Sequence, residues 1–412
     1  MRLVVQKFGG SSLATASLRQ KVVWHVKQAK AKGYSLVVVV SALGRKGDPY
    51  ATDTLQDFLA QTVPALPPRE TDLLLSCGEC IAAAVVAAEL QHAGCNAVAL
   101  TGWQAGIITD EHFGRAEIKR IKKENLLRLL QDDKIAVVAG FQGVTEEGEI
   151  TTLGRGGSDI TAVALGAALE ADFVEIYSDV AAVMTADPRL VPEAKPIMHM
   201  GYQEILQMAQ EGAKVIHPRA VDIALQYNLP LVLKKTGEDS EGTVVSHQQQ
   251  RENFSFHRPQ IVTGITHITG LAQVQILADL SEAKLEEVLA ALSKEGISID
   301  LISFSPEEKM FTIDAKQSKK AAQLLQDLGI TAKVEPGFAK VTVVGSGMRG
   351  TPGVMLRVVT ALNKAKTQIM QTADSHVNIS CLVREEHVAA AVRALHAEFA
   401  LHERNNVSVK LL

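Results

Sequence analysis

The chain has 412 residues, of which 47% are hydrophobic and 21% charged, and its formal net charge is −4 at pH 7. Because domains usually run to about 100–200 residues, a chain of this length predicts two or three domains. The scattered basic residues and slightly negative charge argue against a nucleic-acid-binding protein, and the composition argues against disorder. The longest apolar run, Cys80–Ala88, is shorter than the roughly 18 residues of a membrane span, and the N-terminus lacks the pattern of a signal peptide. We therefore expect a soluble, cytoplasmic protein.

Residues 1 to about 235 alternate short β-branched runs with longer helical patterns. This alternation is typical of an α/β domain with a mostly parallel sheet and helices on both faces. Each expected strand is apolar on both sides, as a buried parallel strand should be. The expected strands are Leu3–Phe8, Leu36–Val40, Ala97–Leu100, Ile135–Ala139, Phe173–Tyr177 and Leu231–Leu233, and the expected helices are Ser17–Lys30, Thr71–Gln91, Ile118–Gln131, Asp159–Glu170, Tyr202–Glu211 and Ala220–Tyr227.

The last third of the chain contains an internal repeat. It follows a polar, glutamine-rich stretch between residues 234 and 260, which indicates a domain boundary. Each copy reads strand, helix, strand, strand, helix, and a closing strand would make each a ferredoxin-like βαββαβ domain. The first copy comprises Leu271–Leu277, Ser281–Lys294, Ile297–Phe304, Met310–Ala315 and Ser318–Leu328, and the second comprises Lys340–Val344, Val354–Asn363, Gln368–Thr372, Asn378–Val383 and Glu385–Phe399.

The stretch KFGGSS at residues 7–12 ends the first strand shortly before a helix. Adjacent Gly9 and Gly10 let backbone N–H groups approach phosphate oxygens, the following helix adds its positive end, and Lys7 adds a full positive charge. Paired glycines also make tight turns for steric reasons alone, so this stretch by itself is weak evidence for a phosphate site.

The stretch LGRGGSD at residues 153–159 also opens a helix. Arg155 can hold a carboxylate or phosphate with two parallel hydrogen bonds, and Gly157 and Ser158 can present further donors. Asp159 can cap the helix, or it can hold Lys7 or a magnesium ion in place. A second anion site is therefore expected here.

Two later stretches follow a buried strand or join two helices. Residues 177–189 form a loop at the carboxyl edge of the sheet, where ligands bind in open α/β folds. The stretch GAKVIHPR at residues 212–219 places Lys214 between two helices, and we interpret His217 as a structural residue rather than a base.

Several other functional classes lack support. The GxxxxGK[ST] and GxGxxG patterns and the protein-kinase signatures do not occur. Cys77 and Cys80 form one CxxC pair without a second pair or a histidine cluster, so we interpret them as ordinary helix residues rather than a metal or redox site.

Seven motifs together resemble the aspartokinase family, in order and in approximate spacing. They are KFGGSS, Ser41-Ala42, Thr52-Asp53, Ser76-Cys77-Gly78-Glu79, LGRGGSD, TADPR and GAKVIHPRA. The terminal repeat resembles a pair of ACT domains, small modules that bind free amino acids. The resemblance implies an amino-acid kinase catalytic domain at residues 1–245 and ACT-like regulatory domains at residues 262–338 and 339–412.

The resemblance also implies transfer of the ATP γ-phosphate to the β-carboxylate of L-aspartate, the first step toward lysine, threonine, methionine and diaminopimelate. Lys7 and Asp159 would be catalytic. Substrate would be bound by Ser41, Thr52, Glu79, Arg155 and Ser158, and nucleotide by Lys7, Gly9, Gly10, Ser11, Ser178, Asp179, Met184, Asp187, Arg189 and Lys214. ATP and Mg²⁺ are the expected cofactors, with magnesium held through the phosphates rather than by a dedicated site. A carboxylate with an ordinary pKa of about 3.9 is ionised at neutral pH, so the reaction needs no general base.

The same resemblance implies feedback inhibition by lysine, threonine or diaminopimelate and a homo-oligomer formed through the ACT-like domains. We expect effector contacts at Ser298, Asp300, Gln368, Gln371 and Asp374. The sequence leaves open which amino acid is the effector, whether the assembly is a dimer or a tetramer, and whether the two repeats are sequential or interleaved.

The chain departs from the family pattern after the fifth strand and at the nucleotide edge. Ala181 removes an acidic group, Ala182 replaces a glycine, and Met184 stands where an aromatic residue often meets the adenine. Lys234-Lys235 replaces the commoner arginine-serine pair. Two alternatives remain: a glutamate or N-acetylglutamate kinase of the same fold, and an inactive amino-acid sensor.

Overall fold

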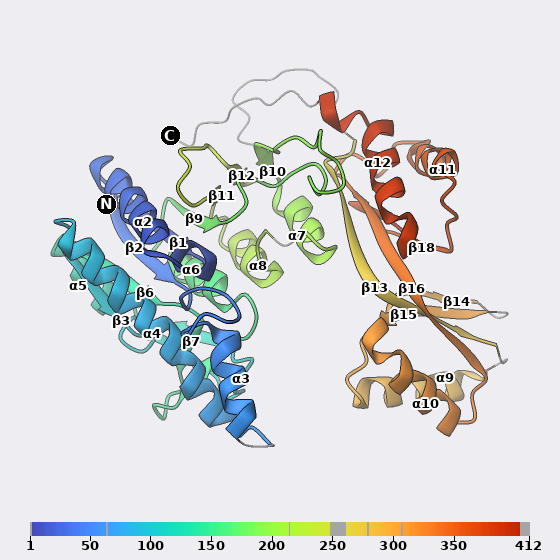
Figure 1. The fold of residues 1–412 in the computed structure, drawn as a ribbon, viewed down its shortest axis with the longest axis horizontal. Helices are drawn as coiled ribbons and strands as arrows, with labels where there is room; N and C mark the ends of the chain where they lie inside the picture. The colour runs from blue at the N-terminus through green and yellow to red at the C-terminus, as the bar shows by residue number, and fades with distance from the viewer. Residues whose placement is uncertain are drawn as a thin grey trace.

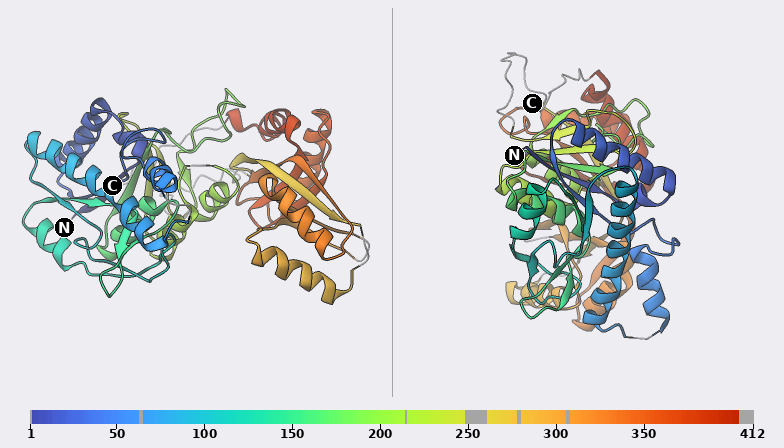
Figure 2. Two further views of the ribbon diagram at one scale, coloured as in Figure 1. Left: turned by 60° about the horizontal axis from the view of Figure 1, so that its bottom comes forward. Right: turned by 90° about the vertical axis from the view of Figure 1, so that its left-hand side faces the viewer.

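The computed structural model describes residues 2–62, 65–213, 215–247, 261–277, 280–305 and 308–403. These residues form an N-terminal lobe, residues 2–247, and a C-terminal lobe, residues 261–403. Figure 1 shows the N-terminal lobe at the left and the C-terminal lobe at the right, and Figure 2 shows the same two lobes from further directions.

The N-terminal lobe is built on an eight-stranded sheet in the order β10-β12-β11-β9-β1-β2-β6-β3. Every pairing is parallel except that of β11 with β12. All six expected strands are present, with ends shifted by at most two residues, because runs that are apolar on both sides are stable only between two layers. The strands are β1 (Leu3–Phe8), β2 (Ser35–Val40), β3 (Ala97–Leu100), β6 (Ile135–Ala139), β9 (Phe173–Ser178), β10 (His199–Met200), β11 (Leu231–Lys235) and β12 (Thr243–Val245).

Helices cover both faces of this sheet. Alternate strand residues point to opposite faces, so Val4 and Phe8 pack under one helical layer while Leu3 and Val5 pack under the other. The first layer contains α2 (Ala16–Ala31) and α4 (Pro68–His92), and the second contains α5 (Glu124–Gln131), α6 (Gly157–Ala168), α7 (Tyr202–Gln210) and α8 (Pro218–Gln226).

A second, four-stranded sheet corrects one prediction. Its order is β5-β4-β7-β8, with β4 (Ile107–Thr109), β5 (Ile118–Ile121), β7 (Gln142–Val144) and β8 (Ile150–Thr152). The expected helix over residues 118–131 is wrong in its first part, because β5 pairs antiparallel with β4 and only α5 is helical. The isoleucine spacing in β5 suits a helix, but the neighbouring strand decides the conformation. The short helices α1 (Gly10–Leu13) and α3 (Thr52–Thr62) were also not expected.

Helix α4 is, among the described residues, the one helix long and apolar enough to cross a membrane by length and composition alone. Here it is a core helix: Ala82, Val86 and Leu90 are buried in the layer that covers the main sheet. It also carries two buried carboxylates, Asp72 and Glu79.

The C-terminal lobe is one six-stranded sheet in the order β14-β15-β13-β16-β18-β17. Its strands are β13 (Gly264–Ile276), β14 (Asp300–Phe304), β15 (Lys309–Asp314), β16 (Ala332–Val344), β17 (Gln371–Asp374) and β18 (Asn378–Arg384), and its helices are α9 (Glu282–Lys294), α10 (Ser318–Asp327), α11 (Val354–Lys364) and α12 (Val388–Glu398). Both expected βαββα copies are present.

The two copies are interleaved. Strand β16 pairs with β13 along its whole length, so its first half closes the first βαββαβ unit and its second half opens the second unit. The first half of β13, residues 264–268, pairs with residues 340–344 and thereby supplies the closing strand of the second unit.

The two lobes share apolar and polar contacts. Val344 of β16 belongs to the core of the N-terminal lobe, and Val191 belongs to the core of the second C-terminal unit. Thr185 is buried between the lobes, where its carbonyl oxygen accepts a hydrogen bond from the Ile265 N–H at 2.8 Å and its hydroxyl lies 2.9 Å from His396 Nε2.

Candidate active site

An ion pair between Lys7 and Asp159 lies at the carboxyl end of the main sheet. The Lys7 ammonium is 2.7 Å from Asp159 Oδ1, and only 11% and 13% of the two side chains are exposed. Lys7 lies in β1 and Asp159 in the first turn of α6, which packs against that face of the sheet. The other Asp159 oxygen accepts a hydrogen bond from the His217 N–H at 3.3 Å. The structure thus brings together the two residues expected to be catalytic and holds the carboxylate from a second side.

Glycines are required on both sides of this pair. A Cβ on Gly10 would lie 2.6 Å from the carbonyl oxygens of Ala42 and Gly44, so only glycine lets the two loops meet. Gly156, which precedes α6, has a φ of +71°, and a Cβ there would lie 2.2 Å from the His217 ring. A Cβ on Gly9 would lie 3.4 Å from the Lys7 ammonium nitrogen, so the glycine turn lies beside that charge.

The Glu79 carboxylate is buried next to this glycine loop. One oxygen accepts a hydrogen bond from the Ala42 N–H at 3.0 Å, and the other has no partner among the described residues. Burial raises the pKa of Glu79 from 4.5 to about 8, although the hydrogen bond from Ala42 acts in the opposite direction. A buried carboxyl oxygen without a donor is suited to receive an ammonium group of a ligand.

The other expected substrate residues line the same region. Ser41 follows β2 and Thr52 begins α3, and this segment packs on α4 at Gly78, where a Cβ would lie 3.0 Å from the Tyr50 carbonyl. Ser158 is buried in the first turn of α6. Arg155 is exposed in the preceding loop, and no carboxylate of the described residues pairs with it.

Arg45 is a candidate that the sequence analysis missed. Its guanidinium is 2.6 Å from Asp179 Oδ2, so the loop after β2 reaches the loop after β9. The signal was its position in the loop after the second strand, at the same sheet edge as Lys7. Ser178 belongs to this edge as well: its hydroxyl accepts a hydrogen bond from the Val180 N–H, and its carbonyl accepts one from the Thr236 N–H.

The remaining expected nucleotide residues lie toward the C-terminal lobe. Met184 packs against the core of the second C-terminal unit. Asp187 pairs with Arg189 at 2.6 Å, and the Arg189 guanidinium lowers the pKa of the Asp187 carboxyl. Their role in nucleotide binding stays a prediction, and Lys214 lies outside the described residues. His217 is the N-cap of α8 and accepts a hydrogen bond from the Arg219 N–H, which confirms its structural interpretation.

The expected effector residues fall into two groups. Asp300, Gln371 and Asp374 lie in strands β14 and β17, whereas Ser298 and Gln368 lie in the loops before these strands. The two strands stand at opposite ends of the sheet order, yet the Gln371 side-chain amide donates a hydrogen bond to the Leu301 carbonyl. The sheet therefore brings both predicted segments into contact.

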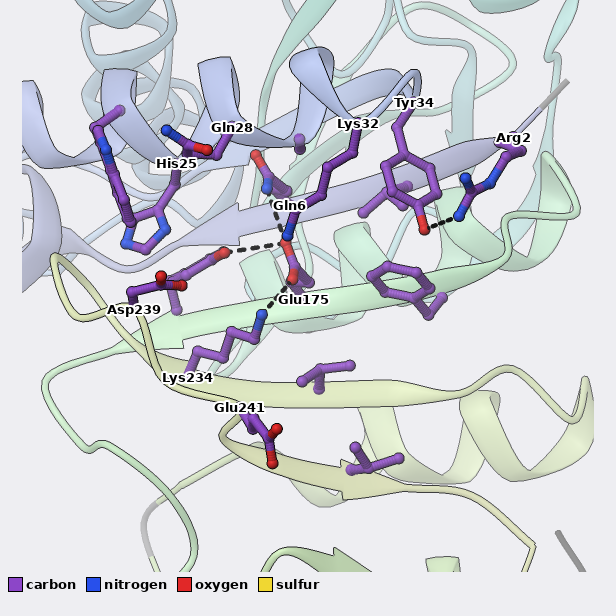
Figure 3. A pocket seen from close by; sticks show the side chains of 17 residues that line it. Arg2, Gln6, His25, Gln28, Lys32, Tyr34, Glu175, Lys234, Asp239 and Glu241 are labelled. Atoms are coloured by element: carbon purple, nitrogen blue, oxygen red, sulfur yellow. Dashed lines mark hydrogen bonds and ion pairs between the residues drawn. The ribbon is translucent and has the colours of Figure 1, made fainter. Parts of the chain in front are cut away.

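A cavity of about 520 Å³ lies on the opposite face of the main sheet from Lys7. Figure 3 shows Glu175 at its floor with Gln6 and Lys234 directed at the carboxylate, and His25 on the helix above. Burial would raise the pKa of Glu175, but the Lys234 ammonium 2.8 Å away holds it below its ordinary value. Burial also lowers the pKa of His25 to about 4, and its Nε2 accepts a hydrogen bond from the Gly237 N–H. This cluster fastens β1, β9 and β11 together, and its residues are separate from the Lys7 site.

Two known protein families match parts of this chain. The Amino acid kinase family matches residues 2–235, and the ACT domain family matches residues 333–397. Aspartokinase 1 of Bacillus subtilis (strain 168) is 44% identical over 402 residues, which cover 97% of this chain and 100% of that protein. The aspartokinase of Corynebacterium glutamicum is 37% identical over 415 residues, covering 97% of each chain.

Solved structures show the same architecture. Escherichia coli aspartokinase III in complex with aspartate and ADP superimposes with a TM-score of 0.77 at 25% identity, covering 96% of this chain and 99% of that one. The complex of that enzyme with lysine and aspartate gives a TM-score of 0.75 at the same identity. The fold, the site and the family match define this chain as a member of the amino acid kinase family. Within it, the full-length similarity places the chain among the aspartokinases.

Proposed function

We propose that this chain is an aspartate kinase that transfers the γ-phosphoryl group of ATP to the β-carboxylate of L-aspartate, giving 4-phospho-L-aspartate and ADP. This reaction is the first step of lysine, threonine, methionine and diaminopimelate biosynthesis. The full-length similarity to aspartokinases supports the proposal. The observation that carries it is that the glycine turn beside the Lys7–Asp159 pair and the buried Glu79 carboxylate both lie against Ala42.

The residues present fit the chemistry that this transfer needs. The aspartate β-carboxylate attacks the γ-phosphorus, and the bond from that phosphorus to the β,γ-bridging oxygen breaks as ADP leaves. Both reactants are anions, so alignment and neutralisation of charge dominate the catalysis. We assign neutralisation of the transferring phosphoryl group to Lys7, and its orientation to Asp159.

We assign recognition of the aspartate α-ammonium to Glu79 and of its α-carboxylate to Arg155. Ser41, Thr52 and Ser158 would add hydrogen bonds. A buried carboxyl oxygen without a donor and an exposed guanidinium without a carboxylate partner in the described chain together match a zwitterionic substrate.

ATP follows from the kinase family, and Mg²⁺ is part of the proposal. The turn at Gly9 and Gly10 with Lys7 would hold the phosphates, and Ser11, Ser178, Asp179, Met184, Asp187, Arg189 and Lys214 would complete the nucleotide site. Magnesium bound to the phosphates would neutralise charge that develops on ADP. We assign magnesium to the nucleotide phosphates rather than to a dedicated protein site.

The C-terminal lobe is proposed to regulate the enzyme. We retain residues 1–245 as the catalytic domain and residues 262–338 and 339–412 as regulatory units, with strand 264–268 of the first closing the second. Lysine, threonine or diaminopimelate would bind near Ser298, Asp300, Gln368, Gln371 and Asp374 and inhibit. We further propose a homo-oligomer formed through these units and a cytoplasmic location.

An assay of ADP release with ATP, Mg²⁺ and L-aspartate, L-glutamate or N-acetyl-L-glutamate tests this function. We expect turnover with aspartate alone, and a kcat for Lys7→Ala at least ~10²-fold lower, the scale of losing one preorganised electrostatic group. Lys27→Ala, on the exposed side of α2, serves as the matched control. Turnover with another acid alone would identify a different kinase of this fold. Silence with all three would identify an inactive sensor, and a normal kcat in Lys7→Ala would overturn the site.

A further inference from the structure

Arg45 and Asp179 pair across the end of the strand that lies between their own two strands. Arg45 follows β2 and Asp179 follows β9, and these strands pair with β1 on its two sides. Neighbouring strands of a sheet lie about 4.8 Å apart, so β2 and β9 are separated by roughly 10 Å. The Arg45 guanidinium is 2.6 Å from Asp179 Oδ2, so the two side chains span this distance. The pair therefore crosses the carboxyl end of β1, where Lys7 and the turn at Gly9 and Gly10 lie.

Backbone hydrogen bonds fasten both neighbouring loops to that turn. The Gly44 N–H donates to the Gly10 carbonyl at 3.0 Å, and the Gly9 N–H donates to the Tyr177 carbonyl at 3.3 Å. Arg45 is thus attached one residue beyond the first of these contacts. The start of its side chain is therefore fixed relative to the turn at which the nucleotide phosphates are proposed to bind.

The loop that carries Arg45 is held by hydrogen bonds of its own. The Asp48 carboxylate accepts a hydrogen bond from the Arg45 N–H at 2.7 Å, and the Asp48 N–H donates to the Arg45 carbonyl at 2.8 Å. The Gly47 N–H donates to the Thr54 hydroxyl of α3 at 3.0 Å. The backbone is therefore held in place, and the Arg45 side chain can change its partner without a rearrangement of the loop.

The ion pair between Arg45 and Asp179 is readily exchanged for a stronger interaction. The two side chains are 66% and 61% exposed. An ion pair this exposed shifts an equilibrium by at most about 5-fold, because water screens the two charges. Hydrogen bonds from a guanidinium to phosphate oxygens are charge-assisted and can form two at a time, and an interaction of this kind contributes about 10-fold or more. A phosphate group at the glycine turn would therefore displace Asp179 from Arg45.

We propose that Arg45 binds the phosphates of ATP. In the free protein Asp179 holds its guanidinium, and on nucleotide binding the guanidinium turns from that carboxylate to a phosphate oxygen above Gly9 and Gly10. A guanidinium keeps its charge at every working pH, so Arg45 adds a second full positive charge to that of Lys7. The Asp179 carboxylate is released for the place in the nucleotide site that the proposed function gives it.

This inference rests on the proposed function and adds a residue to it. Phosphoryl transfer brings two anions together, and an arginine from a loop of the same chain can stabilise the charge on the transferred group. The neighbouring cation is directed elsewhere, since the Lys46 ammonium pairs with Asp57 of α3 at 2.8 Å rather than with the loop after β9. Arg45 and Lys46 therefore provide a matched pair of positions in one loop.

The test compares Arg45→Ala with Lys46→Ala in the full chain. Calorimetry measures the affinity of each variant for ATP with Mg²⁺ and, separately, for L-aspartate. We expect the ATP affinity to fall by at least ~10-fold in Arg45→Ala and to be unchanged in Lys46→Ala. The aspartate affinity should be unchanged in both variants. A residue that only held the loop in place would weaken the binding of both ligands, because Ser41 and Thr52 flank the same loop.

The variant Asp179→Ala separates a direct phosphate contact from an effect that acts through the carboxylate. If Arg45 binds phosphate directly, adding Arg45→Ala to Asp179→Ala lowers the ATP affinity by a further ~10-fold or more. The absence of this further loss would overturn the proposal. Unchanged ATP affinity in Arg45→Ala, an equal fall in aspartate affinity, or a wild type that does not bind ATP would also overturn it.

Failure of this inference and failure of the proposed function give different results. If the wild type binds ATP through Arg45 but phosphorylates none of the three acids, the kinase function falls and the phosphate contact stands. If the wild type phosphorylates aspartate and Arg45→Ala binds ATP as tightly as the wild type, the kinase function stands and the phosphate contact falls.

Discussion

Burial shifts the pKa of individual side chains at the site. Glu79 is the clearest example, because its carboxyl group is buried against Ala42 with one oxygen lacking a partner among the described residues. The neutral acid predominates at neutral pH in the ligand-free protein, since burial raises its pKa to about 8. An incoming ammonium stabilises the ionised form, so substrate binding and ionisation of Glu79 are linked.

The pH dependence of aspartate binding follows from this linkage. Only the ionised carboxylate binds the ammonium, so the KM for aspartate should fall by roughly tenfold per unit as pH rises from 6 to 7 and level off above about 8. Glu79→Gln should raise KM and remove this dependence, and the exposed Glu111→Gln should retain it. A wild-type KM that is constant over this range would contradict the assignment of Glu79.

The raised pKa of Glu79 also determines the direction in which the stability of the protein changes with pH. Its folded-state pKa of about 8 lies above the ordinary value of 4.5, so between these values the folded chain binds more protons than the unfolded chain. The free energy of unfolding of the ligand-free protein should therefore include a term that falls as pH rises through this window. Comparison of urea unfolding of the wild type and Glu79→Gln between pH 5 and 8 isolates that term.

At the scale of elements, helix α4 joins the two sheets of the N-terminal lobe. The fully buried Asp72 carboxylate accepts hydrogen bonds from the Gly114 N–H at 2.8 Å, the Thr152 N–H at 2.7 Å and the Thr152 hydroxyl at 2.8 Å. The four-stranded sheet is thereby anchored to the helix that carries Glu79. The position of Glu79 thus depends on a contact about two turns away along the helix.

Removal of this anchor should destabilise the fold. Asp72→Ala leaves buried donors without an acceptor, and each such donor costs about 1–3 kcal/mol, so the free energy of unfolding should fall by at least ~2 kcal/mol. Glu70→Ala, in the same helix turn but 53% exposed and paired with Arg69, should change it by less than about 1 kcal/mol. Denaturant unfolding of both variants measures this difference, and equal values would show that Asp72 is not an anchor.

At the scale of the whole molecule, the segment after β9 serves both lobes. Residues 184–195 follow the site loop and pack on the second C-terminal unit through Ala186 and Val191. Thr185 is the central contact, because its hydroxyl lies 2.9 Å from His396 Nε2 and accepts a hydrogen bond from the Lys195 N–H. Displacement of α12 therefore reaches the segment that carries the predicted nucleotide residues Asp187 and Arg189.

Loss of the His396 contact should loosen this segment. A hydrogen bond of about 1 kcal/mol corresponds to a factor of about 5, so His396→Ala should speed amide hydrogen exchange in residues 184–195 by at least that factor. The control His387→Ala lies just before α12, with 42% of its side chain exposed, and should leave this exchange unchanged. Unchanged exchange in His396→Ala would show that the lobes are held together elsewhere.

The sequence alone determined the local parts of this protein. Buried strands and amphipathic helices have periodic patterns within a few residues. Six of the eight main-sheet strands and both βαββα copies could therefore be predicted. Lys7 and Asp159 were predicted as partners through a motif resemblance, and the structure places them 2.7 Å apart.

Only the tertiary structure decided which distant segments meet. Nothing near residue 264 indicates that this strand closes a unit ending more than a hundred residues later, and β5 is a strand only because β4 lies beside it. The Arg45–Asp179 pair and the ion pair between Lys340 and Glu211 likewise join residues far apart in the chain. Such pairings depend on the packing of whole layers, which leaves no pattern in a short stretch of sequence.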